Sequence, residues 1–248
     1  QENPYWVTKY RQNNDTRNRL LGNVSLKYAP TNWFDIELRG GTDYYTTTKN
    51  EKVYAGGNTS PRGLYNEGSE TFYENNYSFL ATARKDNLLD RLGRFVTFGG
   101  NLMMQQRTKM NASAGELLVP DLFSLNNGIN KPTVTSELIR RKMNSLYGSL
   151  QLNWDGYLFL DVTARNDWSS TMSKDNRSYF YPSVSLSGVI SDMLPKIGGN
   201  MPEWFTFAKV RASYAEVGND LDPYQLYNNY TVGKDENGNT TAAPGQIL

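Results

Sequence analysis

Hydrophobic and polar residues alternate along most of this chain with a period of two. In residues 19–28, Leu20, Gly22, Val24, Leu26 and Tyr28 alternate with Arg19, Asn23, Ser25 and Lys27, with Leu21 as the exception. A period of two is typical of a β-strand with one apolar and one polar face, whereas apolar positions in helices recur every three to four residues. The same alternation predicts eight strands, at residues 19–28, 33–45, 73–84, 94–108, 143–154, 157–168, 181–191 and 205–216.

The connections between these strands alternate in length. Short ones include the turns at residues 29–32 and 155–156, whereas residues 46–72 and 109–137 form long ones. In an up-and-down antiparallel sheet every second connection lies at the same end, so the short ones share one rim and the long ones the other. Outer-membrane barrels show this asymmetry, and the predicted strands have about the 9–11 residues that a tilted strand needs to cross a bilayer.

Aromatic residues gather at the strand ends. Those beside the short connections are Tyr28, Trp33, Phe34, Phe95, Trp154, Tyr157, Trp204 and Phe205. Those beside the long connections are Tyr44, Tyr45, Tyr73, Trp168, Tyr179, Phe180, Tyr181 and Tyr214. Two aromatic bands with aliphatic residues between them are expected at the two interfaces of a membrane, because Trp and Tyr combine an apolar body with a polar tip.

The charged residues indicate which strand face meets lipid. Asp161 and Arg165 share one face of strand 157–168, and Lys209 and Arg211 share one face of strand 205–216. A basic residue that faces lipid near the bilayer midplane costs about 2–4 kcal/mol. We therefore expect the aliphatic faces to point outward to lipid and the charged faces to line a wet lumen.

Composition narrows the class of protein. The chain has no cysteine and no histidine, which excludes disulfides, thiolate catalysis, Ser-His-Asp triads and histidine-ligated metals. Its 248 residues carry a formal charge of +1 without a large basic block, which argues against nucleic-acid binding. Its longest apolar runs, such as residues 157–160, are far shorter than the roughly 20 residues of a membrane-spanning helix.

The sequence contains no motif that is typical of an enzyme active site. The chain has neither a P-loop nor a dinucleotide-binding glycine pattern. The paired carboxylates of a glycosidase lie at most about 9.5 Å apart. Asp161 and Asp167 are about 20 Å apart along one strand, at roughly 3.3 Å per residue. A pair between two strands stays open, but we predict that the chain is not an enzyme and has no cofactor.

Two blocks of sequence resemble a known family. The first comprises Ala164-Arg165-Asn166-Asp167-Trp168-Ser169-Ser170-Thr171 and, after a short gap, Lys174-Asp175-Asn176-Arg177-Ser178-Tyr179-Phe180-Tyr181-Pro182-Ser183. The second runs from Lys209-Val210-Arg211-Ala212-Ser213-Tyr214-Ala215-Glu216-Val217-Gly218-Asn219-Asp220 to Pro223-Tyr224. In order and spacing these blocks are similar to hallmarks of SusC/RagA-type TonB-dependent outer-membrane transporters.

The resemblance implies a 22-stranded barrel in the outer membrane of a Gram-negative bacterium, closed by a plug and energised by TonB. It further implies import of glycans, oligosaccharides or peptides together with a SusD-like surface lipoprotein. No signal peptide, TonB box, plug or terminal aromatic strand is recognisable. We therefore expect residues 1–248 to be one partial barrel domain: an all-β, antiparallel up-and-down transmembrane β-barrel wall with about eight strands of the larger barrel.

Seven residues are candidates for facing the substrate: Arg165, Asp167, Trp168, Lys209, Arg211, Asp220 and Asp222. The charged ones on strands either meet the solute or are solvated charges of the wall. Residues 166–170 read most simply as a strand end with Trp168 at the interface, and direct substrate contact is the alternative. Asp220 and Asp222 offer oxygen ligands for calcium, but the full ligand spacing of a calcium loop does not follow, so we predict no metal site.

A different class of protein shares many of these features. A secreted, soluble β-sandwich that binds carbohydrate would also have alternating strands and aromatic residues that stack on sugars. Its apolar faces would pack against each other in one core, whereas those of a barrel form a continuous outer band. The burial of the apolar faces therefore separates the two hypotheses.

Overall fold

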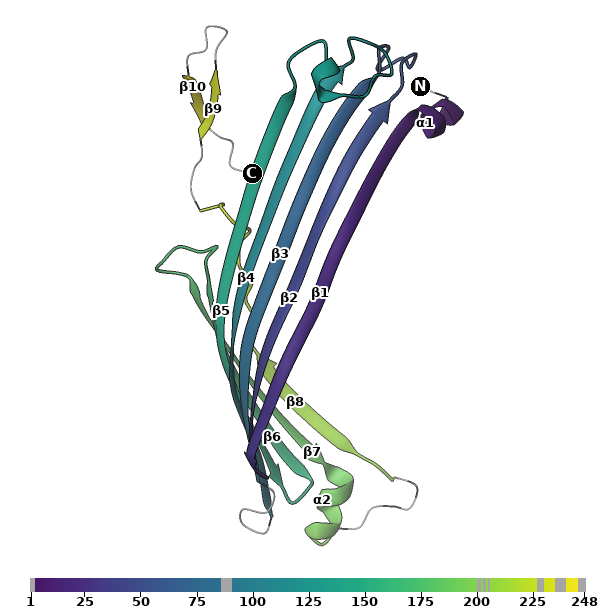
Figure 1. Ribbon diagram of the computed structural model, residues 1–248. Coiled ribbons are helices and arrows are strands. Elements are labelled where there is room, and N and C mark those ends of the chain that lie inside the picture. Colours follow the sequence, from purple (N-terminus) through teal and green to yellow (C-terminus); the bar gives the residue numbers. More distant parts are fainter. Residues whose placement is uncertain are drawn as a thin grey trace. The chain divides into compact units, whose positions relative to one another are not determined.

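A computed structural model describes residues 3–85, 91–199, 202, 204 and 206–226, and the backbone of residues 230–234 and 240–244. The chain is almost entirely β-structure (Figure 1). Its elements are α1 (Pro4–Tyr10), β1 (Arg11–Thr31), β2 (Phe34–Val53), β3 (Leu64–Lys85), β4 (Leu92–Glu116), η1 (Leu125–Asn127), β5 (Thr133–Trp154), β6 (Leu158–Ser169), β7 (Ser178–Val189), α2 (Ile190–Lys196), β8 (Lys209–Ala215), β9 (Tyr230–Lys234) and β10 (Thr240–Pro244).

Strands β1 to β8 form one sheet in which the spatial order follows the sequence order. The pairs β5–β6, β6–β7 and β7–β8 are antiparallel, with Trp154 opposite Leu158 at the tight turn between β5 and β6. This topology confirms the predicted all-β, up-and-down arrangement of eight strands. Strands β9 and β10 form a separate two-stranded sheet, in a part of the chain for which no strand was predicted.

The first five strands are longer than the sequence pattern predicted, at 20 to 25 residues. Most of residues 46–72 and both ends of residues 109–137, predicted as long loops, therefore belong to strands, and the connections shrink to residues 54–63 and 117–132. Apolar alternation marks only those parts of a strand that have one apolar face. Where both faces are wet, Thr, Tyr and Asn continue the strand without that signal.

The short connections contain the predicted turns. Asp155 and Gly156 take positive φ angles of 54° and 78°, which the tight turn requires and which Gly and Asp tolerate better than other residues. Helix α2 begins at Ile190, so the last two residues of the predicted strand 181–191 are helical, and the helix continues into the predicted connection 192–204. Residues 86–90 of the predicted connection 85–93 lie outside the described residues. No helix among the described residues is long and apolar enough to span a membrane.

The chain divides into two compact units, and each long strand contributes to both. Unit 1 comprises Gln1–Asn23, Gly41–Asn75 and Met104–Arg140, and unit 2 comprises Val24–Gly40, Asn76–Met103 and Arg141–Leu248. Unit 1 has a small core of its own, in which Leu117 is fully buried and packs with Tyr65 and Ala114 under Phe123 and Leu125. The loop of residues 117–132 thus covers apolar side chains of its own unit.

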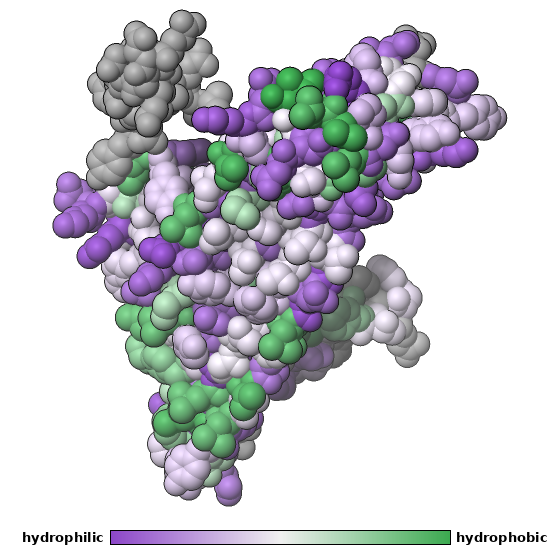
Figure 2. Space-filling model, turned by 45° about the horizontal axis from the view of Figure 1, so that its top comes forward, coloured by the Kyte–Doolittle hydropathy of each residue, from purple (hydrophilic) through white to green (hydrophobic). Residues whose placement is uncertain are grey.

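Unit 2 leaves its apolar strand faces uncovered. Leu26 is 67% exposed, Phe98 is 52% exposed and Leu186 is 49% exposed, although each lies at an apolar position of its strand. Figure 2 shows hydrophobic side chains gathered in patches between hydrophilic ones on the visible face. The β-sandwich alternative requires a second sheet packed on these strands, and within the described residues no sheet does so. The apolar face of unit 2 therefore needs an apolar environment from outside the chain.

Candidate functional site

Asp167 and Arg165, two of the predicted residues, form an ion pair on the polar face of β6. The guanidinium Nε of Arg165 donates to both carboxylate oxygens of Asp167, at 2.8 and 3.0 Å, and its Nη2 donates to Ser145 Oγ at 3.1 Å. The Asp167 residue is only 7% exposed. The two side chains neutralise each other's charge, and the bond from Arg165 to Ser145 joins the polar faces of β5 and β6.

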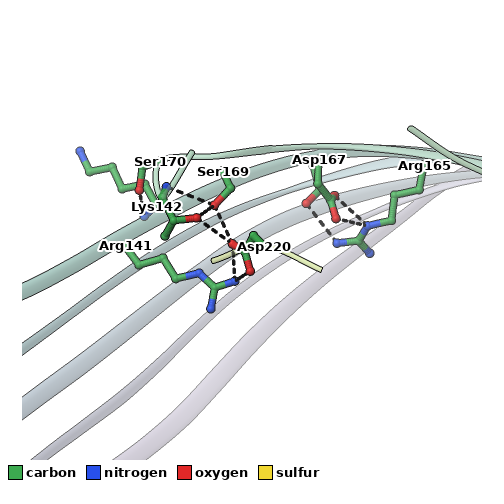
Figure 3. Close-up of polar contacts among 9 residues, drawn as sticks. Arg141, Lys142, Arg165, Asp167, Ser169, Ser170 and Asp220 are labelled. Carbon is green, nitrogen blue, oxygen red and sulfur yellow. Dashed lines mark hydrogen bonds and ion pairs between the residues drawn. The ribbon is translucent and has the colours of Figure 1, made fainter. Parts of the chain in front are cut away.

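Asp220 lies in the segment after β8 and reaches back to Arg141 in the middle of β5 and to Ser169 at the end of β6 (Figure 3). Arg141 Nη2 donates to both of its carboxylate oxygens at 2.8 Å. Ser169 Oγ and Thr171 Oγ1 donate to its Oδ2 at 2.7 and 3.1 Å. We call these four residues, Arg141, Ser169, Thr171 and Asp220, the Asp220 cluster.

The surroundings of Asp220 favour its charged form. Burial by itself would raise the pKa of Asp220, but the hydrogen bonds from Ser169 and Thr171 and the positive charge of Arg141 outweigh it and hold the pKa below the usual range. Gly218 helps the segment to lie close, because a Cβ there would come within 3.0 Å of the Tyr181 ring. The cluster therefore fastens the segment after β8 to the middle of β5 and to the end of β6.

Lys209 and Arg211 line a hollow on the polar face of unit 2, near its short connections. The hollow has a volume of about 410 Å³, and its lining includes four cationic side chains, Arg84, Arg94, Lys209 and Arg211, but only one carboxylate, Asp161. Arg84 is already paired with Asp35 at 2.6 Å. We call this feature the basic hollow; its excess positive charge attracts anionic groups.

The other two candidate residues lie elsewhere. Trp168 follows Asp167 in β6 and so points to the opposite, apolar face, where it lines a groove with Tyr77 and Phe79. Asp222 is exposed, two residues beyond the Asp220 cluster. The structure thus brings together Arg165 with Asp167 and Lys209 with Arg211, but it does not gather all seven residues at one site.

Unit 1 contains a further hollow, of about 630 Å³, that the sequence did not indicate. It is lined mainly by polar residues of β1 to β5, among them Asn13, Asp15, Lys49, Glu51, Asn66, Asn111, Ser113 and Thr133. Asn66 Nδ2 donates to Glu51 Oε2 at 2.7 Å, and this bond fixes the side-chain amide. Asn66 Oδ1 is buried without a donor among the described residues. We call this the polar hollow.

Several residues of these sites were not among the candidates predicted from the sequence. Arg141 lies 79 positions before Asp220, between the predicted loop 109–137 and the predicted strand 143–154, and no local pattern links the two. Ser169 and Thr171 belong to the recognised sequence block, so their position could have suggested a role. Among the described residues no group of three or more His, Cys, Asp or Glu side chains could hold a metal ion, and the carboxylate of Asp220 is committed to Arg141.

An antiparallel sheet in sequence order, with one uncovered apolar face and one charged face, is the wall of a membrane-spanning β-barrel. The particular family follows from comparison with known proteins. The chain belongs to the family of TonB-dependent receptor-like β-barrels, whose family model matches residues 1–246. Proteins of this family are transporters and not enzymes.

Individual relatives agree with this assignment. The TonB-dependent receptor P26 of Formosa agariphila is 27% identical in an alignment of 240 residues, and the match covers 90% of this chain and 23% of the relative. Structures of the RagAB peptide transporter, and of the RagAB peptide importer in its closed-closed state, match 98% of the chain with TM-scores of 0.83 and 0.85. Their sequence identity is 16% and 17%, so they show the fold alone. The chain spans about a quarter of the length of these proteins.

Proposed function

We propose that residues 1–248 are a partial barrel domain of an outer-membrane TonB-dependent transporter of a Gram-negative bacterium. The uncovered apolar face of unit 2 carries this proposal, because exposed residues such as Leu26, Phe98 and Leu186 require lipid rather than water. The opposite faces, with Arg165, Asp167 and the basic hollow, then border the aqueous lumen. Family membership supports the same placement.

The imported solute is an oligosaccharide, a glycan or a peptide, taken up with a SusD-like surface lipoprotein and driven by TonB through parts of the protein beyond these residues. Two features support a solute of this size and polarity. The polar hollow of unit 1 is large enough for a short segment of such a chain and offers amide and hydroxyl groups. The structurally similar RagAB complex is described as a peptide importer.

A deletion of the whole gene tests the transport function. The deletion strain should grow normally on monosaccharides and amino acids but lose growth on one class of polymer, and the intact gene should restore it. Growth on peptides, on neutral glycans and on acidic glycans identifies the class. The protein should sediment with outer membranes and resist extraction by salt. Release by salt alone would contradict the proposal.

A second experiment separates solute contact from wall structure. Arg165→Gln, Asp167→Asn and Lys209→Gln are compared with Lys174→Gln, which changes an exposed lysine in the connection after β6. If the lumen charges meet the solute, the first three reduce uptake while the amount of folded protein in the membrane is unchanged. Equal uptake by all four variants would make the lumen residues solvated charges of the wall.

A further inference from the structure

The apolar face of unit 2 is not uniform, because it contains a groove of about 450 Å³. Its lining comes from β3, β4, β5 and β6, and its large apolar side chains are Tyr77, Phe79, Leu102, Leu146 and Trp168. The floor is formed at Gly100, where a Cβ would come within 2.7 Å of the Phe79 ring and 3.0 Å of Leu146. Any larger residue at this position would disturb the walls, so the glycine keeps the groove open.

The rim of the groove marks the membrane interface beside a long connection. Trp168 pairs with Asn144 across β5 and β6, and Ser178 of β7 lies opposite Trp168. Asn166, one pair further into the sheet, exchanges hydrogen bonds with Ser178 at 2.9 and 3.2 Å. An aromatic residue among amides and hydroxyls is typical of the level of the lipid headgroups, whereas Leu146 and Leu102 lie at the depth of the acyl chains.

A cation stands just beyond this rim. Lys142 lies on the same face of β5 as Asn144 and Leu146, about 13 Å from Leu146 at roughly 3.3 Å per residue. The backbone N–H and C=O groups of Lys142 are both hydrogen-bonded to Ser170. Lys142 N donates to Ser170 Oγ at 2.8 Å, and Lys142 O accepts from Ser170 N at 2.9 Å. Figure 3 shows the Lys142 side chain extending away from Asp220. The residue is exposed, and no ion pair joins it to a carboxylate in the described part of the chain.

We infer that this groove is a specific binding site for a phosphorylated acyl lipid of the outer leaflet, with one acyl chain along Gly100 and the phosphate on Lys142. The apolar lining matches a hydrocarbon chain, and the lysine supplies the complementary charge at headgroup level. A lipid that has both an acyl chain and a phosphate is therefore stabilised by both contacts. A neutral lipid, or an anion without an acyl chain, is stabilised by only one of them and binds more weakly.

Because the site rests on the proposed placement in the outer membrane, the test uses full-length protein purified from that membrane. The protein is exchanged into lipid-free detergent and titrated with lipid A or with dephosphorylated lipid A, and native mass spectrometry measures the affinity. Lys142→Gln should weaken binding of lipid A about five-fold and leave binding of the dephosphorylated form unchanged. Leu102→Trp, which fills the groove without changing Gly100, should weaken binding of both by about ten-fold.

Two variants serve as matched controls. Arg177→Gln removes an exposed cation from the connection between β6 and β7, and Leu186→Phe enlarges an apolar side chain on the same sheet face outside the groove. Both should bind lipid A like the original protein. Equal affinities of all variants for lipid A would show that lipid contacts the groove without specificity, as it contacts the rest of the apolar face, and would overturn the inference. A protein that inserts and imports normally but shows this result would leave the proposed function intact, whereas absence from the outer membrane would defeat the function itself.

Discussion

The two units differ in the burial of their apolar side chains. In unit 1, Leu117 is fully buried with Tyr65 and Ala114 under side chains of its own connection. In unit 2, Leu186, Phe98 and Leu26 remain about half to two-thirds exposed. A water-soluble region must bury its apolar groups within the chain, whereas a region in lipid can leave them outside. On the proposed placement in the outer membrane, the difference distinguishes the parts of the long strands that lie in water from those that lie in the bilayer.

The strongest test of this comparison is the core of unit 1. Leu117→Ala removes a fully buried side chain and should lower the free energy of unfolding by about 2–5 kcal/mol. The neighbouring Leu118 is 59% exposed, so Leu118→Ala should cost less than about 0.5 kcal/mol. Denaturant unfolding of the full-length protein in detergent measures both. Similar values for the two variants would show that unit 1 has no core of its own.

A charge placed on either face of β7 tests the lipid contact of unit 2. Leu186 lies on the apolar face, and Ser185, which pairs with Asp161 and Ser213, lies on the polar face. In a bilayer, Leu186→Arg should cost about 2–4 kcal/mol, whereas Ser185→Arg should cost less than about 1 kcal/mol. Folding into lipid vesicles, followed by heat-modifiable migration, gives the comparison. A larger effect for Ser185→Arg would reverse the assignment of the faces.

The Asp220 cluster should hold the segment after β8 to the sheet. Asp220→Asn removes the charge that pairs with Arg141 and should weaken this attachment by about 1–3 kcal/mol, because hydrogen bonds to charged groups are among the stronger ones. Hydrogen exchange of the Ser169, Ser170 and Thr171 amides should accelerate accordingly. The exposed Asp222 provides the control, and Asp222→Asn should leave the exchange unchanged. An effect of equal size at both positions would remove the special role of Asp220.

Acid should release the same segment. The pKa of Asp220 is lowered in the folded protein, so its contribution to stability is present above its ordinary pKa of about 4 and is lost as the pH falls through the lower, folded value. A nitroxide attached at Asp222→Cys reports on the segment, since residues 1–248 contain no cysteine. Its mobility should be constant from neutral pH down to about 4 and rise below that. A rise near neutral pH would point to another group.

The smallest expected effect concerns the polar edge of the unit 1 core. Tyr65 donates its hydroxyl hydrogen to Glu67 at 2.5 Å, and this bond, reinforced by burial, raises the pKa of Tyr65 to about 12. Its contribution is complete below the ordinary pKa of about 10 and is lost as the pH rises toward 12. Tyr65→Phe should cost about 0.5–1.5 kcal/mol at neutral pH. The thermal unfolding of unit 1 measures this, and no change would mean that water replaces the bond.

The sequence predicted the class of structure better than the extent of its elements. Alternation in β6 and β7 located both strands to within a few residues, because each has one apolar and one polar face. It missed the outer part of β2, which is almost entirely polar, and the outer part of β4, where the apolar side is formed by small residues such as Ala112 and Ala114. It also placed Trp168 among residues that face the substrate, although the alternation itself puts Trp168 on the face opposite Asp167.

By itself, the sequence determined the eight strands of the large sheet, though not their full length, the two faces of these strands, and the absence of histidine and cysteine chemistry, because a period of two and a composition are local properties. Only the tertiary structure decided that Asp220 pairs with Arg141, that Gly100 opens a groove between Phe79 and Leu146, and that a connection covers Leu117. Each of these contacts joins separate elements. Their partners are chosen by strand register and by the course of the connections, which no local pattern records.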